Sequence, residues 1–150
     1  MTPESNELLE QIERENGGPI KWRTYAFLLN REGSKIDGIG GLLYIVGDRL
    51  IFEDFESQRP RYLVLGSRRK TYTKTKLQVS LDSITSFMPL TRGDALRVME
   101  GKIPLEEVKP PSGIRKLLDR TVHVLRFTEG DPWFCELFDP EGLEDFLEDN

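Results

Sequence analysis

Short runs of aromatic and β-branched residues, bounded by glycine, proline and acidic residues, recur along most of the chain and predict β-strands. The expected strands cover 21–29, 40–46, 49–55, 71–79, 83–88, 121–127 and 133–138, and 61–65 is a further candidate. Only Gly47-Asp48 separates the second strand from the third, and glycine in the first position of a two-residue loop suits a type II′ hairpin turn. A polar turn is expected at 30–35, and the strand at 83–88 is expected to end at Pro89, which has no backbone N–H to donate.

A helix is expected at the N-terminus. Thr2-Pro3 places a capping hydroxyl before a proline that suits the first helical position, and the Asn-Gly-Gly-Pro run at 16–19 ends the helix. Its apolar stripe is narrow, which suits packing on the domain surface; the alternative is an arm that docks a partner. The stripe consists of Leu8, Leu9 and Ile12. Residues 1–18 are therefore interpreted as a helical extension of a single domain that covers 19–150.

A second helix is expected at the C-terminus, where Asp139-Pro140 repeats the pattern of a capping residue followed by proline. Leu143, Phe146 and Leu147 then follow at i, i+3 and i+4, on one side of a helix. We expect this apolar side to close one end of the β-structure.

The stretch 91–118 interrupts the strand pattern. Asp94 is expected to cap a short helix that carries Leu96 and Met99 on one side, and Pro110-Pro111 must be irregular because neither residue donates a backbone hydrogen bond. The stretch is interpreted as a partly helical insertion that lies against the strands. A peptide-binding groove lined by Leu96, Met99 and Ile103 is an alternative use of these apolar residues, besides ordinary packing.

The segment from Gly41 to Phe52, a glycine-led strand with an aromatic residue, a tight turn and an Arg-Leu-Ile-Phe strand, resembles the GRAM and bacterial pleckstrin-homology-like domains. Leu81 to Ile84 resembles a later turn into a strand in these families, and Trp133-Phe134 followed by Asp139-Pro140 resembles their last strand and capping helix. The resemblance implies a mainly β fold: an antiparallel sandwich or partly open barrel of about seven strands, capped by the C-terminal helix.

The charge is distributed unevenly. The whole chain of 150 residues has a net charge of −5, with −4 on residues 1–18 and −6 on residues 139–150, so the body between them carries +5. A strongly acidic chain disfavours nonspecific nucleic-acid binding, which depends on lysine and arginine displacing counterions. No nucleic-acid partner is therefore expected.

Few residues suggest catalysis. Cys135 is the only cysteine, which indicates a reducing, cytoplasmic location and a small buried apolar side chain rather than a nucleophile. His123 is the only histidine and lies within a strand, where a packing role is expected. The glycines at 38–41 form no phosphate-binding motif and are interpreted as relieving crowding at a turn. No cofactor or metal is expected, and the first residues do not resemble a secretory signal.

The best candidate site is a basic cluster in the expected loop after the third strand, joined by two basic residues of the turn at 30–35. Its members are Arg31, Lys35, Arg59, Arg61, Arg68, Arg69 and Lys70, with Lys74 and Lys76 extending it. Converging guanidinium groups can hold phosphate or carboxylate groups in a bidentate manner. The alternative is that these residues are solvated and protect strand edges from aggregation. The acidic C-terminal helix is a further candidate, for a basic partner.

These observations favour a non-enzymatic binding module whose partner is a protein or peptide. The first alternative is a peripheral membrane adaptor that contacts anionic headgroups through the basic cluster. The second is an enzyme of unrecognised type, which would need a pocket with converging, perturbed titratable groups.

Overall fold

The structure is a computed structural model that describes residues 3–32, 35–54, 76–111 and 120–149. Its helices are α1 (Pro3–Asn16), α2 (Arg92–Met99) and α4 (Pro140–Asp149), with short 3-10 turns η3 (Leu81–Ser83) and η4 (Leu105–Glu107). The strands are β1 (Ile20–Glu32), β2 (Lys35–Val46), β3 (Arg49–Asp54), β4 (Lys76–Ser80), β5 (Ile84–Thr91), β6 (Thr121–Phe127) and β7 (Trp133–Leu137).

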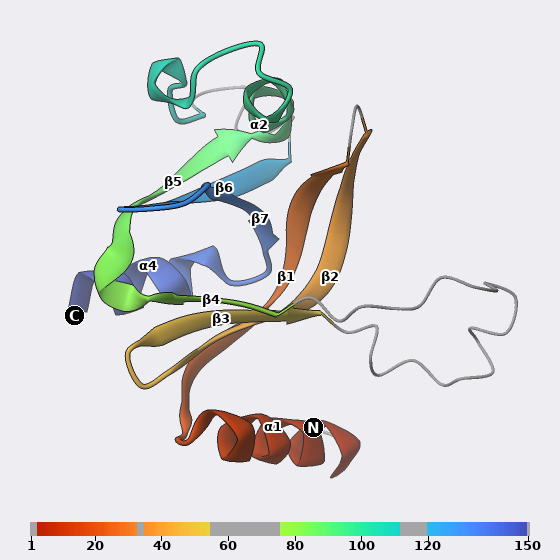
Figure 1. Cartoon of the computed structure of the whole chain (residues 1–150), viewed down its shortest axis with the longest axis vertical. Coiled ribbons are helices and arrows are strands. Elements are labelled where there is room, and N and C mark those ends of the chain that lie inside the picture. Colours follow the sequence, from red (N-terminus) through yellow and green to blue (C-terminus); the bar gives the residue numbers. More distant parts are fainter. Residues whose placement is uncertain (1–2, 33–34, 55–75, 112–119, 150) are drawn as a thin grey trace, which may run out of the picture.

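The seven strands of the described residues form one antiparallel sheet in the order β4-β3-β2-β1-β7-β6-β5. The two edge strands, β4 and β5, are consecutive in sequence, so the sheet must curl to let η3 join them (Figure 1). The N–H of Leu81 donates to the Asp48 carbonyl at 2.8 Å, and the N–H of Thr128 donates to the Ser83 carbonyl at 2.8 Å. These bonds tie η3 to the β2–β3 and β6–β7 turns and complete a curled half-barrel.

The main core lies inside the curl, where inward residues of β1, β2, β3, β6 and β7 meet α4. Leu143 of α4 is fully buried there, and Phe146 and Leu147 pack against the same cluster. The helix begins as expected, because the Asp139 Oδ1 accepts the N–H of Gly142 at 3.1 Å. The mainly β fold of about seven strands, partly open and capped by a C-terminal helix, is therefore confirmed.

The outer face of the sheet is covered at one end by α1. Ile12 packs there with residues of β2 and β3, and Leu8 and Leu9 lie beside it. Polar groups fix the end of the helix: Asn16 Nδ2 donates to the Tyr44 hydroxyl at 3.2 Å, and that hydroxyl donates to the Glu53 carboxylate. Burial first, and then the Glu53 contact, raises the pKa of Tyr44 above its usual value, so the phenol stays protonated. Surface packing of the N-terminal helix is confirmed.

The other end of the outer face is covered by the described part of the predicted insertion, residues 91–111. Ala95 of α2 and Leu105 of η4 pack on Leu29, Leu90 and the outward residues of β6 and β7. Met99 packs against the same cluster, as expected. Asp94 is not the capping residue, because the Thr91 Oγ1 accepts the N–H of Asp94 at 3.1 Å. The helix therefore begins at Arg92, three residues earlier than a cap at Asp94 implies.

Three other expectations about local structure are wrong. Residues 30–35 are not a loop as a whole, because β1 runs to Glu32 and β2 begins at Lys35. The strand from residue 83 does not end at Pro89, which lies inside β5 opposite His123. Proline is tolerated there because β5 is an edge strand with a side that needs no ladder hydrogen bonds. The glycines at 38–41 lie within β2, not at a turn.

Some expectations fall outside the described residues: the Thr2 cap, the candidate strand at 61–65 and the first part of the expected strand at 71–79. The β2–β3 hairpin is confirmed, with Val46 opposite Arg49 and Gly47 at φ +61°, in the left-handed region. Among the described residues, no helix is long and apolar enough to cross a bilayer.

Candidate functional site: the cleft between β5 and α4

The basic cluster predicted from the sequence is not assembled by the described part of the chain. Arg59, Arg61, Arg68, Arg69 and Lys70 lie outside the described residues. The backbones of Arg31 and Lys35 pair with Ile36 and Glu32 at the tip of the β1–β2 hairpin. The Lys76 ammonium lies 3.4 Å from Glu53 Oε1 and 3.2 Å from Asn16 Oδ1, so this lysine helps to dock α1.

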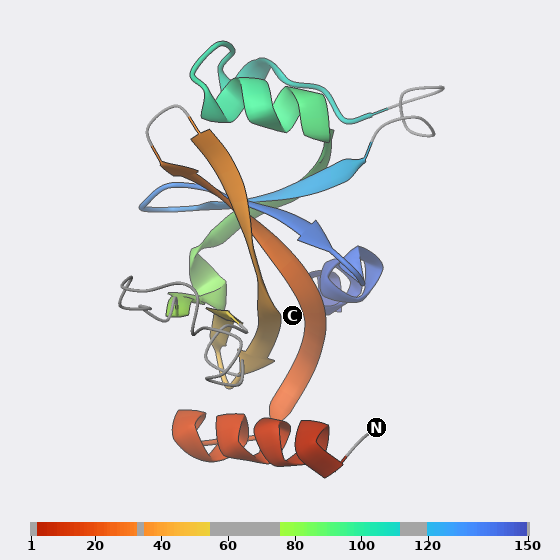
Figure 2. The ribbon, with the colours of Figure 1, turned by 90° about the vertical axis from the view of Figure 1, so that its right-hand side faces the viewer.

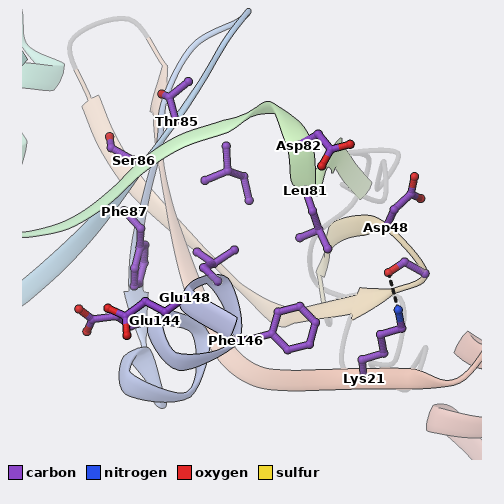
Figure 3. Close-up of a pocket in the computed structure, with 13 residues that line it drawn as sticks. Lys21, Asp48, Leu81, Asp82, Thr85, Ser86, Phe87, Glu144, Phe146 and Glu148 are labelled. Carbon is purple, nitrogen blue, oxygen red and sulfur yellow. Dashed lines mark hydrogen bonds between the residues drawn. The ribbon is translucent and has the colours of Figure 1, made fainter. Parts of the chain in front are cut away.

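A cleft of about 640 Å³ opens at a different place, between β5 and α4 (Figure 3). Its walls come from five elements, the start of β1, the β2–β3 turn, η3, the first half of β5 and the last turns of α4, which belong to separate parts of the sequence. The lining residues are Lys21, Gly47, Asp48, Leu81, Asp82, Ile84, Thr85, Ser86, Phe87, Glu144, Phe146, Leu147 and Glu148. The curl of the sheet brings them together, and within the described part of the chain no strand pairs with the outer side of β5.

The floor of the cleft is apolar. Leu81 and Phe87 reach it from η3 and β5, and Phe146 points toward it from α4 (Figure 3). The apolar side chains of α4 differ in burial: Leu143 is fully buried in the core, whereas Phe146 and Leu147 are half-buried and also line the cleft. The capping helix therefore both closes the core and leaves apolar surface accessible to a ligand.

The rim of the cleft is acidic. Asp48 and Asp82 lie at one end, and Glu144 and Glu148 lie at the other (Figure 3). Lys21 is the one basic residue among the described residues of the lining, and its ammonium donates to the Gly47 carbonyl at 3.1 Å. Four carboxylates against one ammonium give the cleft a formal charge of −3 and a field that attracts cationic groups.

The edge of β5 faces this cleft. Alternate residues of a strand point to opposite faces, yet four consecutive residues of β5, Ile84 to Phe87, line the cleft. The strand must therefore present its edge rather than one face. Thr85 is the extra residue of a bulge, since the register with β6 shifts between Ile84 and Ser86.

Pro89 shows which backbone groups point outward. It has no N–H, so its pair with His123 must be one in which the two residues do not exchange hydrogen bonds. Such pairs alternate along the ladder, and Phe87 opposite Leu125 is the next of the same type. The N–H and C=O of Phe87 therefore point away from β6, toward the open edge beside the cleft.

The two residues most suited to bond-making chemistry lie outside this cleft lining. His123 and Cys135 are opposite each other on β6 and β7. Burial lowers the pKa of His123, whose ring stacks on Phe87 at 4.9 Å, and burial raises the pKa of the Cys135 thiol to about 12. The expected burial of Cys135 is confirmed. Within the described ranges, no three histidine, cysteine or acidic residues are placed to hold a metal ion.

The cleft was only partly foreseen from the sequence. The acidic C-terminal helix was a candidate for a basic partner, and two of its carboxylates do form the rim. The contributions of Asp48 and Asp82 carry no sequence signal, since both occur in ordinary polar turns.

Comparison with known proteins gives little beyond the fold. No family model and no curated protein matches the chain. One solved structure is similar: the C-terminal domain of an unknown protein from Leishmania infantum, with a TM-score of 0.51 and 12% sequence identity. The match covers 97% of this chain and 94% of that domain, so it supports a shared overall fold and nothing finer.

Proposed function

We propose that this chain is a non-enzymatic binding module that holds an extended segment of a partner protein in the cleft between β5 and α4. The observation that carries the proposal is the open edge of β5 beside an apolar, acid-rimmed cleft. An extended peptide that adds to a sheet edge gains main-chain hydrogen bonds, and pockets for its alternate side chains give specificity. The GRAM and pleckstrin-homology-like resemblance remains a prediction for this chain.

The geometry limits what such a segment looks like. Ile84 to Phe87 span about 10 Å, since three steps separate them at roughly 3.3 Å per strand residue. The bulge at Thr85 and the proline at 89 interrupt the edge on either side of Phe87, so only a short ladder can form. These two features also protect the edge from unspecific pairing. We infer a short segment whose apolar side chains enter the floor beside Leu81, Phe87 and Phe146.

The charges of the rim select the residues that flank this segment. Carboxylates stand at both ends of the cleft, so lysine or arginine on each side of the apolar core is favoured. Phosphate and lipid headgroups are disfavoured at this site because the formal charge of the lining is −3. The charge of the cleft therefore favours a basic and apolar peptide over an anionic membrane at this site.

The test is selection of short random peptides displayed on phage against the full chain, followed by fluorescence anisotropy with the synthetic winning peptide. We expect extended sequences with an apolar centre and basic flanks, whose affinity falls with added salt. Glu144→Lys/Glu148→Lys should weaken binding by on the order of tenfold, since each exposed charge pair is worth about 0.2–1 kcal/mol and reversal also adds repulsion.

The matched control is Asp145→Lys/Asp149→Lys, which makes the same charge change at the two neighbouring positions of α4 that do not line the cleft. Equal loss of affinity in both variants would show only a general charge effect. Failure to select any peptide, together with binding to phosphatidylserine vesicles, would replace the proposal with the membrane-adaptor alternative.

A further inference from the structure

The outer face of the curled sheet has three apolar zones. One lies under α1 and one under α2 and η4. The third lies between them on β1, β2 and β7, where Tyr25, Phe27 and Phe138 are 63%, 45% and 83% exposed. Figure 2 shows β1 and β2 running between the two helices. Among the described residues, these three are the exposed large hydrophobic side chains, and together they form what we call the aromatic band.

The band is a continuous surface with a recess. Tyr25 and Phe27 are two residues apart on β1 and therefore share a face. Phe138 extends beyond the end of β7, with its N–H bonded to the Tyr25 carbonyl at 3.0 Å and its ring 6.4 Å from the Tyr25 ring. Beside them, the Phe27 ring lies over Gly38, where a Cβ would overlap it. The missing side chains of β2 leave a shallow cavity of about 460 Å³ bordered by Phe27, Gly40 and Phe138.

The size of the band fits a small protein interface. The exposed fractions of the three side chains add up to the equivalent of about 1.9 fully exposed aromatic side chains. At roughly 200 Å² each, the band exposes about 380 Å² of aromatic surface per molecule. Two such surfaces facing each other supply about 760 Å². If this is the roughly 65% apolar share of a homodimer interface, the whole interface buries about 1,200 Å², the lower limit of a stable one.

The electrostatics of the band suit a second copy. Glu136 borders the band and would face its own copy across a two-fold axis. Its carboxylate is paired with Arg92 at 3.3 Å and Arg120 at 2.8 Å, in a group with a formal charge of +1, so the two copies would not face each other with unpaired carboxylates. We propose that the chain forms a symmetric dimer through the aromatic band, with the protruding Phe138 ring of each copy in the glycine-lined recess of the other. This proposal is independent of the cleft.

Sedimentation equilibrium of the full chain, from about 1 μM to about 1 mM, tests the dimer. We expect reversible dimerisation with a dissociation constant in the micromolar range, as an interface of minimal size implies. Phe138→Asp should raise that constant by about 30-fold for each buried ring, or on the order of 1,000-fold for the pair. Its melting temperature at low concentration should match that of the parent chain, because the ring is 83% exposed.

Thr128→Asp adds the same charge at an exposed turn position away from the band and should leave dimerisation unchanged. A chain that stays monomeric across this range would overturn the proposal. So would a dimer that Phe138→Asp does not weaken, because the contact would then lie on another surface.

Discussion

Gly142 is the position at which the docking of α4 can be tested most sharply, because two physical effects predict opposite outcomes. Replacing a glycine within a helix by alanine stabilises the helix by up to about 1 kcal/mol. At Gly142, however, a Cβ would overlap Asp139 Oδ2 and lie 2.7 Å from Nε1 of Trp22, which packs in the core. Glycine therefore stands here because the first turn of α4 approaches β1 closely.

The expected cost of Gly142→Ala can be worked out from these contacts. Overpacking a tight site costs about 1–3 kcal/mol, and displacing the Asp139 cap costs about 1 kcal/mol. Against a gain of up to about 1 kcal/mol in helix propensity, the net loss is about 2 kcal/mol. For a chain of this length that corresponds to a drop in melting temperature of about 4–8 °C.

The assay is urea unfolding followed by far-UV circular dichroism. Asp145→Ala is the control, since it improves helix propensity at an exposed position of the same helix and should not destabilise the chain. Trp22→Phe removes the conflicting nitrogen, which has no hydrogen-bond partner among the described residues. In that background Gly142→Ala should cost at least about 1 kcal/mol less. A stabilising Gly142→Ala, or an unchanged cost in the Trp22→Phe background, would refute the close approach of α4 and β1.

Two further predictions concern the sheet. A Cβ on Gly41 would overlap the Glu53 carbonyl and lie 2.7 Å from Phe52 Cζ, whereas one on Gly40 meets only the Phe27 ring at 3.5 Å. In thermal unfolding, Gly41→Ala should therefore lower the free energy of unfolding by more than about 2 kcal/mol and Gly40→Ala by less than about 1 kcal/mol. Equal losses would contradict the close β2–β3 packing. Burial lowers the pKa of His123 from its usual value of about 6.5, so the stability that the neutral ring contributes is complete above that pH and is lost as the pH falls through the lowered pKa. Between about pH 7 and pH 5 the free energy of unfolding should therefore decline less steeply for His123→Gln than for the parent chain. Parallel curves would count against a buried neutral histidine.

The elements predicted well from the sequence are those whose signals are local. The hairpin at Gly47-Asp48 needs only a glycine that accepts a positive φ, which it does at +61°. The C-terminal helix needs a cap at Asp139 and an i, i+3, i+4 stripe, and both are observed. In each case a few neighbouring residues determine the outcome, so periodicity and turn chemistry suffice.

The misplaced details depend on tertiary context. Proline predicts the end of a strand, but Pro89 lies inside β5 with its nitrogen directed away from β6, and only the sheet order shows that β5 is an edge strand. The polar residues at 30–35 predict a turn, yet both flanking strands extend into this stretch. The cleft as a whole also depends on tertiary context: Asp48, Asp82 and Glu148 line one cleft only because the sheet curls and places β5 opposite α4.

The central claim, that the edge of β5 receives an extended segment, is tested most directly by hydrogen exchange at the Phe87 amide, followed by NMR with and without the selected peptide. The Phe87 N–H points to the open edge, whereas that of Met88, in a hydrogen-bonded pair with Val124, is already engaged with β6. Saturating peptide should slow exchange at Phe87 by at least about tenfold and change Met88 little. Unchanged exchange at Phe87 while amides elsewhere become protected would place the ligand on another surface and contradict the account.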